Sequence, residues 1–285
     1  MHNAFLEWLS RVPIWPIGIV LLALMTGAFF FGRWIQGRHN RRGSVRKTTA
    51  FDGFVISAVL GLLALLLGFT FSLAIQRFEE RRELVIESAN AIGTAYLRTQ
   101  LLNSPHRERL SRLLVDYTHA QIALADNDFP VTGPLRQKND AILTDIWAAT
   151  TAALGDSKNA ADVVVVSNAM NSVIDISEER QHARSLRIPY EVYLVLLGYL
   201  ISVAGLLGYE MDKGHSTFIG CFVLTLMTVS LLLVIDIDRP GSGGIVESQE
   251  PMLELRDTLN QQAPAIFDRW RKQARGCYKS VTTPD

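Results

Sequence analysis

The sequence has few of the residues from which metal sites are usually built. It contains two cysteines, Cys221 and Cys277, and its six histidines are scattered singly along 285 residues. Neither residue type shows the paired spacing that a metal site requires. The sequence therefore predicts no metal site and no cofactor, and we expect both cysteines to be unpaired.

Catalytic motifs are missing as well. The chain has no GxxxxGK[ST] phosphate loop, no GxSxG nucleophile elbow and no HExxH motif. The 28 basic and 28 acidic residues balance to a formal net charge of zero. The sequence predicts that the protein is not an enzyme, and no nucleic acid partner is expected.

Charges are almost absent from four long apolar stretches. A bilayer core of about 30 Å requires roughly 20 apolar residues in a helix, because every backbone amide must be hydrogen-bonded within the segment. The stretches cover approximately residues 14–32, 53–75, 190–209 and 216–235, and Glu191 is their only formal charge. The sequence predicts an all-α integral membrane protein with four transmembrane helices. Proton-coupled carriers and voltage sensors need ionisable residues inside their spans, so this absence disfavours a pump.

The residues between spans two and three are polar but periodic. Span two is predicted to continue as a helix to about residue 102, with charges spaced for ion pairs along it. Further helices are predicted over 106–125, 135–154 and 160–187, and the apolar positions of each recur along one side. The predicted side of the 135–154 helix consists of Leu135, Ile142, Leu143, Ile146 and Trp147. We expect a helical soluble bundle inserted between spans two and three.

These features predict four parts of the chain. They are an N-terminal transmembrane hairpin (1–75), the soluble helical bundle (76–189), a C-terminal transmembrane hairpin (190–235), and a turn-rich connector with a helical tail (236–285). In the tail, short helices are predicted near 251–262 and 264–275.

Span two carries small residues along one side. Ser57, Gly61, Ala64, Gly68 and Ser72, here called the small-residue stripe, recur at steps of four, three, four and four residues. Small residues allow helices to approach closely. Two interpretations remain open. The stripe packs against another helix of the same subunit, or copies of span two around a symmetry axis line a narrow pore with hydroxyls and exposed backbone.

Three charged residues follow span four within the sequence IDIDRPGSGG. Asp236, Asp238 and Arg239, here called the terminal charge cluster, lie beside a proline that stops the helix. The favoured interpretation is an interfacial salt-bridge network. The alternative is a site for a cation or for a partner loop.

The loop between spans one and two is strongly basic. It carries Arg33, Arg38, Arg41, Arg42, Arg46 and Lys47 and no acidic residue. By the positive-inside rule this loop is expected in the cytoplasm, with the N-terminus, the bundle and the tail outside. Other arginines flank spans two and three, but acidic residues alternate with them and long loops follow the rule poorly.

Three segments resemble one known family. They are RFEERRELVIESANAIGTAYLRTQLL at 77–102, AMNSVIDISEERQHARSLRIP at 169–189 and IDIDRPGSGGIVESQEPMLELRDTL at 235–259. In content and order they are similar to the bacterial bestrophin-like domain family, long described as a domain of unknown function. The resemblance implies kinship with bestrophins, which are pentameric anion channels with four membrane helices per subunit, a pore lined by the second, and a cytosolic helical region after it. Bestrophins keep the first hairpin loop outside, whereas the basic loop here predicts the inverse.

The leading hypothesis is therefore an oligomeric channel-like protein of the bacterial inner membrane that passes anions. Its expected partners are the lipid bilayer, other copies of the same chain and an inorganic anion. The competing hypothesis is a non-conducting membrane scaffold or signalling protein whose bundle binds a partner or a ligand. No calcium-binding or selectivity residue of the bestrophins is matched in this sequence.

Overall fold

The computed structural model describes residues 12–40, 50–125, 133–156, 160–210, 215–241 and 243–269. The described residues form helices and their connections, and none of them lies in a strand. Several predictions fall outside these residues, including those for the basic loop at 41–49, for Cys277 and for a helix beyond residue 269.

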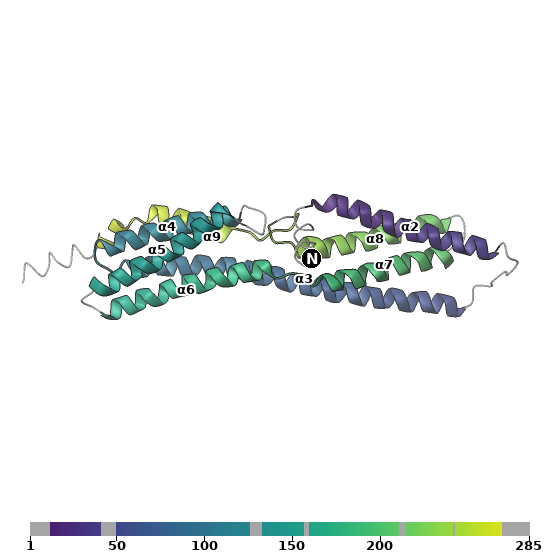
Figure 1. Ribbon diagram of the computed structural model, residues 1–285, viewed down its shortest axis with the longest axis horizontal. Helices are drawn as coiled ribbons and strands as arrows, with labels where there is room; N and C mark the ends of the chain where they lie inside the picture. Colours follow the sequence, from purple (N-terminus) through teal and green to yellow (C-terminus); the bar gives the residue numbers. More distant parts are fainter. Residues whose placement is uncertain are drawn as a thin grey trace, which may run out of the picture. The chain divides into compact units, whose positions relative to one another are not determined.

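Every secondary-structure element of the described residues is a helix (Figure 1). The helices are α2 (Ile14–Asn40), α3 (Ala50–Thr99), α4 (His106–Ala125), α5 (Pro134–Asp156), α6 (Ala160–Ser185), α7 (Tyr190–Glu210), α8 (His215–Ile237), α9 (Glu250–Gln261) and the short 3₁₀ helix η1 (Pro264–Asp268). Every helix predicted within the described residues is present, which confirms the all-helical prediction.

Among the described residues, four helical stretches are long and apolar enough to cross a membrane. They are Ile14–His39, Gly53–Thr99, Ala161–Glu210 and Thr217–Ile237. The apolar part of the third stretch is α7, because α6 carries charged residues throughout its second half. The four predicted spans therefore correspond to α2, the first half of α3, α7 and α8.

The chain divides into two compact units. Unit 1 contains the described residues of 1–79 and 186–246, and unit 2 contains those of 80–185 and 247–285. Helix α3 contributes its first part to unit 1 and its second part to unit 2, without a break in the helix at the boundary. At about 1.5 Å per residue, the 50 residues of α3 extend over about 75 Å.

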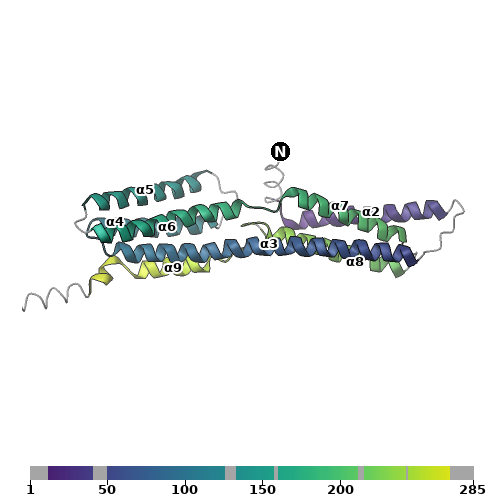
Figure 2. The ribbon, with the colours of Figure 1, turned by 90° about the horizontal axis from the view of Figure 1, so that it is seen from below.

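The core of unit 1 is apolar and comes mainly from three helices. Met25 and Phe29 of α2, Leu200 and Val203 of α7, and Leu224 of α8 are all buried in one cluster. Leu63 is the fully buried residue that α3 adds to it. The three helices lie side by side in Figures 1 and 2.

The core of unit 2 is built from five helices. Tyr96 of α3, Leu114 of α4, Ile146 of α5, Met170 of α6 and Met252 of α9 belong to one buried cluster. Figure 2 shows α9 alongside the second half of α3. The C-terminal segment after the connector thus contributes a helix to the same core as the segment between α3 and α7.

The predicted buried sides agree with the structure for α4 and differ for α5. Leu110, Leu114 and Tyr117 of α4 are fully buried, as their spacing predicts. On α5 the buried residues are Asn139, Ile142, Ile146, Ala149, Thr150 and Ala153. The prediction for Trp147 was wrong, since its side chain is 40% exposed.

Candidate functional site

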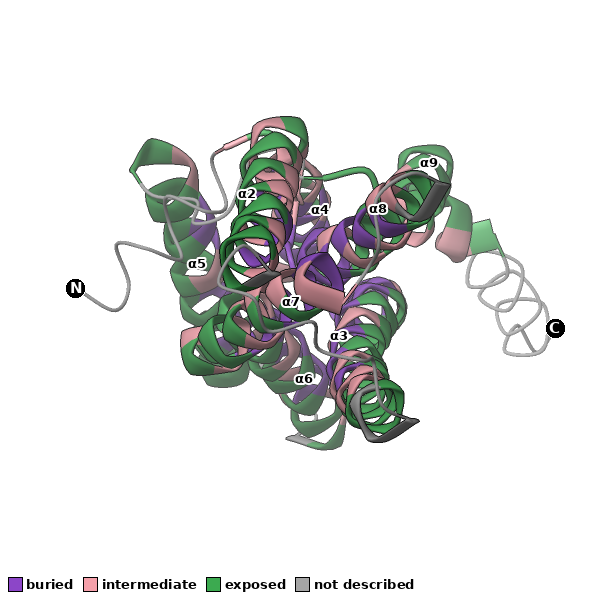
Figure 3. Ribbon diagram, turned by 90° about the vertical axis from the view of Figure 1, so that its right-hand side faces the viewer, coloured by how far each residue is buried: buried purple, intermediate pink, exposed green. Residues whose placement is uncertain are grey.

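The small-residue stripe of α3 faces away from the other helices of its own chain. Ser57, Gly61, Ala64, Gly68 and Ser72 are all exposed. The buried residues of the same part of α3 are Leu63, Thr70 and Ala74. Successive residues turn by about 100° around a helix, so these two sets lie on different sides of α3. Figure 3 shows exposed ribbon along the outer side of α3.

Contacts within the chain do not account for the two glycines of the stripe. A Cβ atom added at Gly61 or at Gly68 would meet no other atom within 4 Å. The Ser57 hydroxyl donates a hydrogen bond to the carbonyl oxygen of Gly53 in its own helix, at 2.9 Å. The side of α3 with the stripe therefore has small side chains, two of which carry hydroxyls. These residues are exposed and are not covered by the described residues of the chain.

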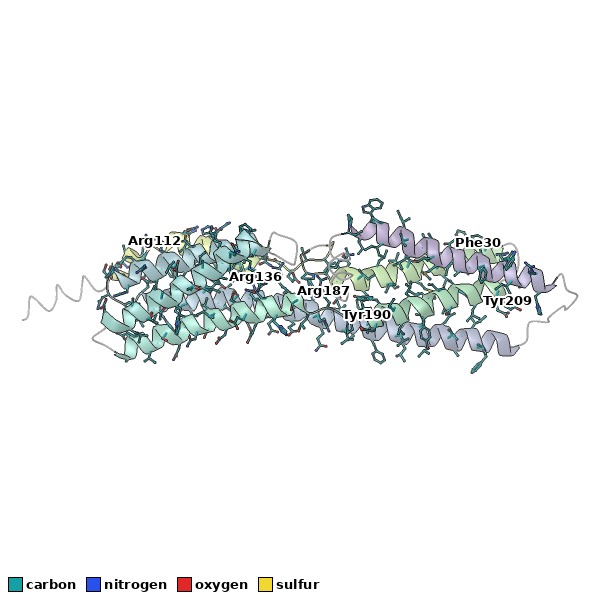
Figure 4. The ribbon with its side chains drawn as sticks, in the orientation of Figure 1. Phe30, Arg112, Arg136, Arg187, Tyr190 and Tyr209 are labelled. Atoms are coloured by element: carbon teal, nitrogen blue, oxygen red, sulfur yellow. The ribbon has the colours of Figure 1, made fainter. Side chains whose placement is uncertain are left out.

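A different set of glycines is used for packing inside unit 1. An added Cβ at Gly208 of α7 would lie 1.9 Å from the carbonyl oxygen of Phe29 in α2, and one at Gly32 would lie 2.0 Å from that of Gly205. These atoms are backbone and cannot rotate away. Figure 4 labels Phe30 and Tyr209, which mark this part of α2 and α7. Small residues thus have a packing role where α2 crosses α7.

The first aspartate of the terminal charge cluster is held by the connector after α8. Asp236 is 8% exposed, and the backbone N–H of Gly244 donates to its two carboxylate oxygens at 3.0 and 3.1 Å. Gly243, whose φ is +156°, lies so close that an added Cβ would be 2.5 Å from Asp236 Oδ1. The glycines of the connector therefore allow it to fold back against this carboxylate.

The second aspartate joins the end of α8 to the start of α7. The carboxylate of Asp238 accepts the backbone N–H of Ile188 at 3.1 and 3.2 Å. It also accepts the hydroxyl of Tyr193, at 3.0 Å. Arg187 Nη1 donates to the Asp238 carbonyl oxygen at 3.5 Å. Figure 4 labels Arg187 and Tyr190 at this end of α7.

Arg239 completes the cluster and is 3% exposed. Its Nη1 donates to the carbonyl oxygen of Val12, just before α2, at 2.8 Å. The cluster therefore bonds to the segments that precede α2 and α7. Among the described residues, no group of three or more His, Cys, Asp or Glu side chains is arranged to hold a metal ion.

The partners of Asp238 are not evident from the sequence. Ile188 and Tyr193 lie about 50 residues earlier in the chain, and only the fold brings them to the end of α8. A weak signal exists in the segment RIPY, because Pro189 separates two helices and leaves backbone amides near it without helical partners. That signal indicates a need for acceptors but does not say which residue supplies them.

Comparison with known proteins identifies one family and one fold. A family model, the Bestrophin-like domain, matches residues 20–252. A crystal structure of a bacterial bestrophin homologue from Klebsiella pneumoniae, a tryptophan-to-alanine variant, is 16% identical with a TM-score of 0.63, and the match covers 88% of this chain and 97% of that one. A tyrosine-to-alanine variant gives 16% identity and a TM-score of 0.62, covering 86% and 96%. Among individually curated proteins no match is found.

Proposed function

The chain belongs to the bestrophin-like family, and from this premise we propose that it forms an oligomeric ion channel that passes anions across the inner membrane. The helices α2, α7, α8 and the first half of α3 span the bilayer in this proposal. Unit 2 is then the soluble helical bundle, inserted between spans two and three and joined by α9.

The observation that carries the proposal is the direction of the small-residue stripe. Gly61 and Gly68 are exposed, and no described residue lies within 4 Å of a Cβ atom added at either position. A helix side with little side-chain volume can be covered by lipid, by a second copy, or by water. Gly, Ala and Ser are poor choices for burying area against lipid, whereas they leave space along an axis shared by several copies of α3.

Several copies of the chain are needed for this arrangement. One helix side cannot enclose a path through the bilayer, but cyclic symmetry brings the same side of each copy to a common axis. Each copy then contributes its Ser57 and Ser72 hydroxyls and the backbone that is exposed at Gly61 and Gly68.

The absence of formal charge along the stripe bears on which ions pass. Carboxylate rings select cations in many channels, and the described part of span two has no carboxylate among its stripe residues. The Ser72 hydroxyl can donate a hydrogen bond to a partly dehydrated anion, and the Ser57 hydroxyl can do so when it rotates away from the Gly53 carbonyl oxygen. Weak donors of this kind allow an anion to enter and also to leave, which conduction requires.

Flux through purified protein in liposomes tests the proposal. We expect chloride flux above that of liposomes containing an inactive membrane protein prepared in the same way, and little flux of potassium. An absence of chloride flux across several lipids and pH values would contradict the channel proposal and favour a membrane scaffold or signalling protein.

A pair of glycine variants tests the position of the stripe. Gly68→Leu should reduce or abolish chloride flux, because one leucine side chain from each copy would fill the space around the axis. Gly198→Leu on α7 is the matched control, since an added Cβ at Gly198 also meets no atom within 4 Å and Gly198 is also exposed. Equal flux in both variants, at equal expression, would contradict a pore lined by the stripe.

The competing function is a membrane scaffold or signalling protein whose bundle binds a partner or a ligand. It is favoured by the continuity of α3, which belongs to both units without a helix break. Cross-linking in native membranes distinguishes the two functions. Stoichiometric capture of one other protein, with no flux in liposomes, would support the scaffold, and self-association alone would count against it.

A further inference from the structure

Unit 2 contains a cavity among α4, α5 and α6. Its volume is about 300 Å³. It is lined by Gln121 and Leu124 of α4, by Arg136 near the start of α5, and by Ser177, Arg180, Gln181, His182, Arg184 and Ser185 of α6. All of these residues belong to unit 2, and the cavity is here called the arginine pocket.

The charges that line the arginine pocket are all positive. Arg136, Arg180 and Arg184 carry guanidinium groups, and no carboxylate is among the described lining residues. Two carboxylates lie near this set. The half-exposed Asp140 forms an ion pair with Arg136 at 3.9 Å, and the buried Glu247 lines a second, very small cavity together with Arg81, Arg180 and Arg184. Glu247 forms an ion pair with Arg81. Positive charge therefore predominates among the side chains that line the arginine pocket.

Arg180 is the most deeply placed of these arginines, and it is 7% exposed. Its Nη1 donates to Gln121 Oε1 at 3.0 Å and to Ser88 Oγ at 3.3 Å. Its Nη2 donates to Gln249 Oε1 at 3.5 Å. Every one of these acceptors is a neutral oxygen. Burial lowers the pKa of Arg180 to about 10, which still leaves the guanidinium charged at neutral pH.

The neutral acceptors hold Arg180 in one orientation. Gln121 Nε2 donates to the Tyr117 hydroxyl at 2.7 Å and to Asn139 Oδ1 at 3.0 Å. Tyr117 and Asn139 are both fully buried. The Gln121 amide is thereby fixed with its oxygen toward Arg180, so the guanidinium is positioned before any ligand binds.

Burial of a cation among neutral groups is costly unless an opposite charge compensates for it. A protein that only needed to fill this space could do so with apolar residues at lower cost. Guanidinium groups are also the side chains that best match the oxygen geometry of phosphate and carboxylate groups, through paired hydrogen bonds. The excess of positive charge therefore points to an anionic ligand.

We propose that the arginine pocket binds a small multivalent oxyanion of the phosphate class, in contact with Arg136, Arg180 and Arg184. This site lies in unit 2, so it is separate from the conduction path proposed for the small-residue stripe. Its volume exceeds that of a single phosphate group, which leaves space for a small phosphate monoester. The ligand acts as a regulator or sensed molecule of the protein.

A neighbouring cavity of opposite charge limits where an anion can bind. It has a volume of about 580 Å³ and is lined by Glu80, Glu83, Glu87, Glu178, Glu179 and His182, among others. Negative charge there repels oxyanions. Helix α6 thus separates an acidic side from the arginine pocket, and only the latter offers a favourable potential to a phosphate group.

Calorimetric titration of the full-length protein in nanodiscs of zwitterionic lipid tests the proposal. Inorganic phosphate and glycerol phosphate are the probes, titrated at constant ionic strength. We expect saturable binding of at least one of them, at one site per chain. The absence of saturable binding of both probes at millimolar concentration would overturn the proposal, whether or not the protein conducts ions.

Variants identify the residues involved. Arg136→Gln should weaken binding by about tenfold, which corresponds to one charge-assisted hydrogen-bonding group. Its guanidinium is half exposed, and the side-chain exposure of 54% makes loss of the fold on substitution unexpected. Arg112→Gln on α4 is the matched control, because Arg112 is exposed and outside the pocket. Figure 4 labels both arginines on unit 2.

Arg180→Gln should abolish binding, and the melting temperature of this variant without phosphate checks that unit 2 still folds. Unchanged binding in both Arg136→Gln and Arg180→Gln would overturn the assignment to this pocket. A further arm uses nanodiscs that contain phosphatidic acid. Competition between this lipid and soluble phosphate would support the same chemistry and assign the natural ligand to a lipid headgroup. Undiminished binding of soluble phosphate in these nanodiscs would assign the natural ligand to a free phosphate compound.

Discussion

At the scale of single residues, Asp238 shows how one side chain can connect two spans. Its carboxylate is 4% exposed and accepts hydrogen bonds from the Ile188 amide and the Tyr193 hydroxyl. Ile188 precedes Pro189, so its amide lies between α6 and α7, outside the hydrogen bonding of either helix. Without Asp238 this buried N–H would have no acceptor at all.

Substitution of Asp238 should therefore destabilise unit 1 more than the loss of one exposed charge does. Asp238→Ala leaves two buried donors unsatisfied, at a cost of about 1–3 kcal/mol each. Tyr193→Phe removes one donor and should cost less. We expect a lowered melting temperature in detergent for both, and less than additive losses in the double variant. Asp257→Ala on the exposed side of α9 is the control, and an equal loss there would contradict this role.

The burial of Arg180 in the arginine pocket is not predictable from the sequence. Arg180 lies in a segment of alternating charges, which predicts a solvated helix surface. Its burial depends on Gln121 and Ser88, which are 59 and 92 residues away in the sequence. No local pattern contains that information, because the partners come from other helices.

At the scale of helices, most boundaries were predictable. Prolines and polar turns mark them, as at Pro105, Pro134 and Pro189, and the predicted ends of α4, α5 and α7 agree with the structure within two residues. The buried side of α5 was less predictable. The spacing of large apolar residues predicts a buried side that includes Trp147, whereas close packing in unit 2 uses Ala149 and Ala153 and leaves Trp147 partly exposed.

The crossing of α2 and α7 gives a prediction at this scale. Gly208→Ala would add a Cβ 1.9 Å from a backbone oxygen of α2, so the two helices must separate. Overpacking of this kind costs about 1–3 kcal/mol or more. We expect Gly208→Ala to lower the melting temperature and the yield of monodisperse protein. Gly198→Ala is the control on the same helix, and similar losses in both variants would show that the crossing is not under steric constraint.

At the scale of the whole molecule, the basic loop leads to a prediction about orientation in the membrane. The basic residues between spans one and two predict that this loop is cytoplasmic, with unit 2 and the tail outside. Arg33 and Arg38 lie in the described part of α2, while the other four basic residues lie outside the described residues. Bestrophins have the opposite orientation. The measured orientation of this protein therefore decides how far the bestrophin pore is a guide to the conduction path proposed for it.

The native cysteines allow a direct test of orientation. Cys277 is in the tail and Cys221 is within α8, so a Cys221→Ser background leaves one reporter. If the basic loop is cytoplasmic, a membrane-impermeant maleimide added to intact spheroplasts should label Cys277. Labelling only after lysis would contradict the prediction and favour the bestrophin orientation. A cytoplasmic protein with an accessible cysteine serves as the integrity control.

Within unit 1, α3 relates the small-residue stripe to the buried side of the same helix by an angle as well as a length. Each residue added to or removed from a helix turns everything after it by about 100° and shifts it by about 1.5 Å. A single deletion between Leu63 and Gly68 would therefore change the phase between the buried side at Leu63 and the part of the stripe that begins at Gly68. Seven residues, close to two full turns, would nearly restore that phase. Loops in such a protein are free to drift in length over evolution, whereas α3 is expected to change only by near-whole turns.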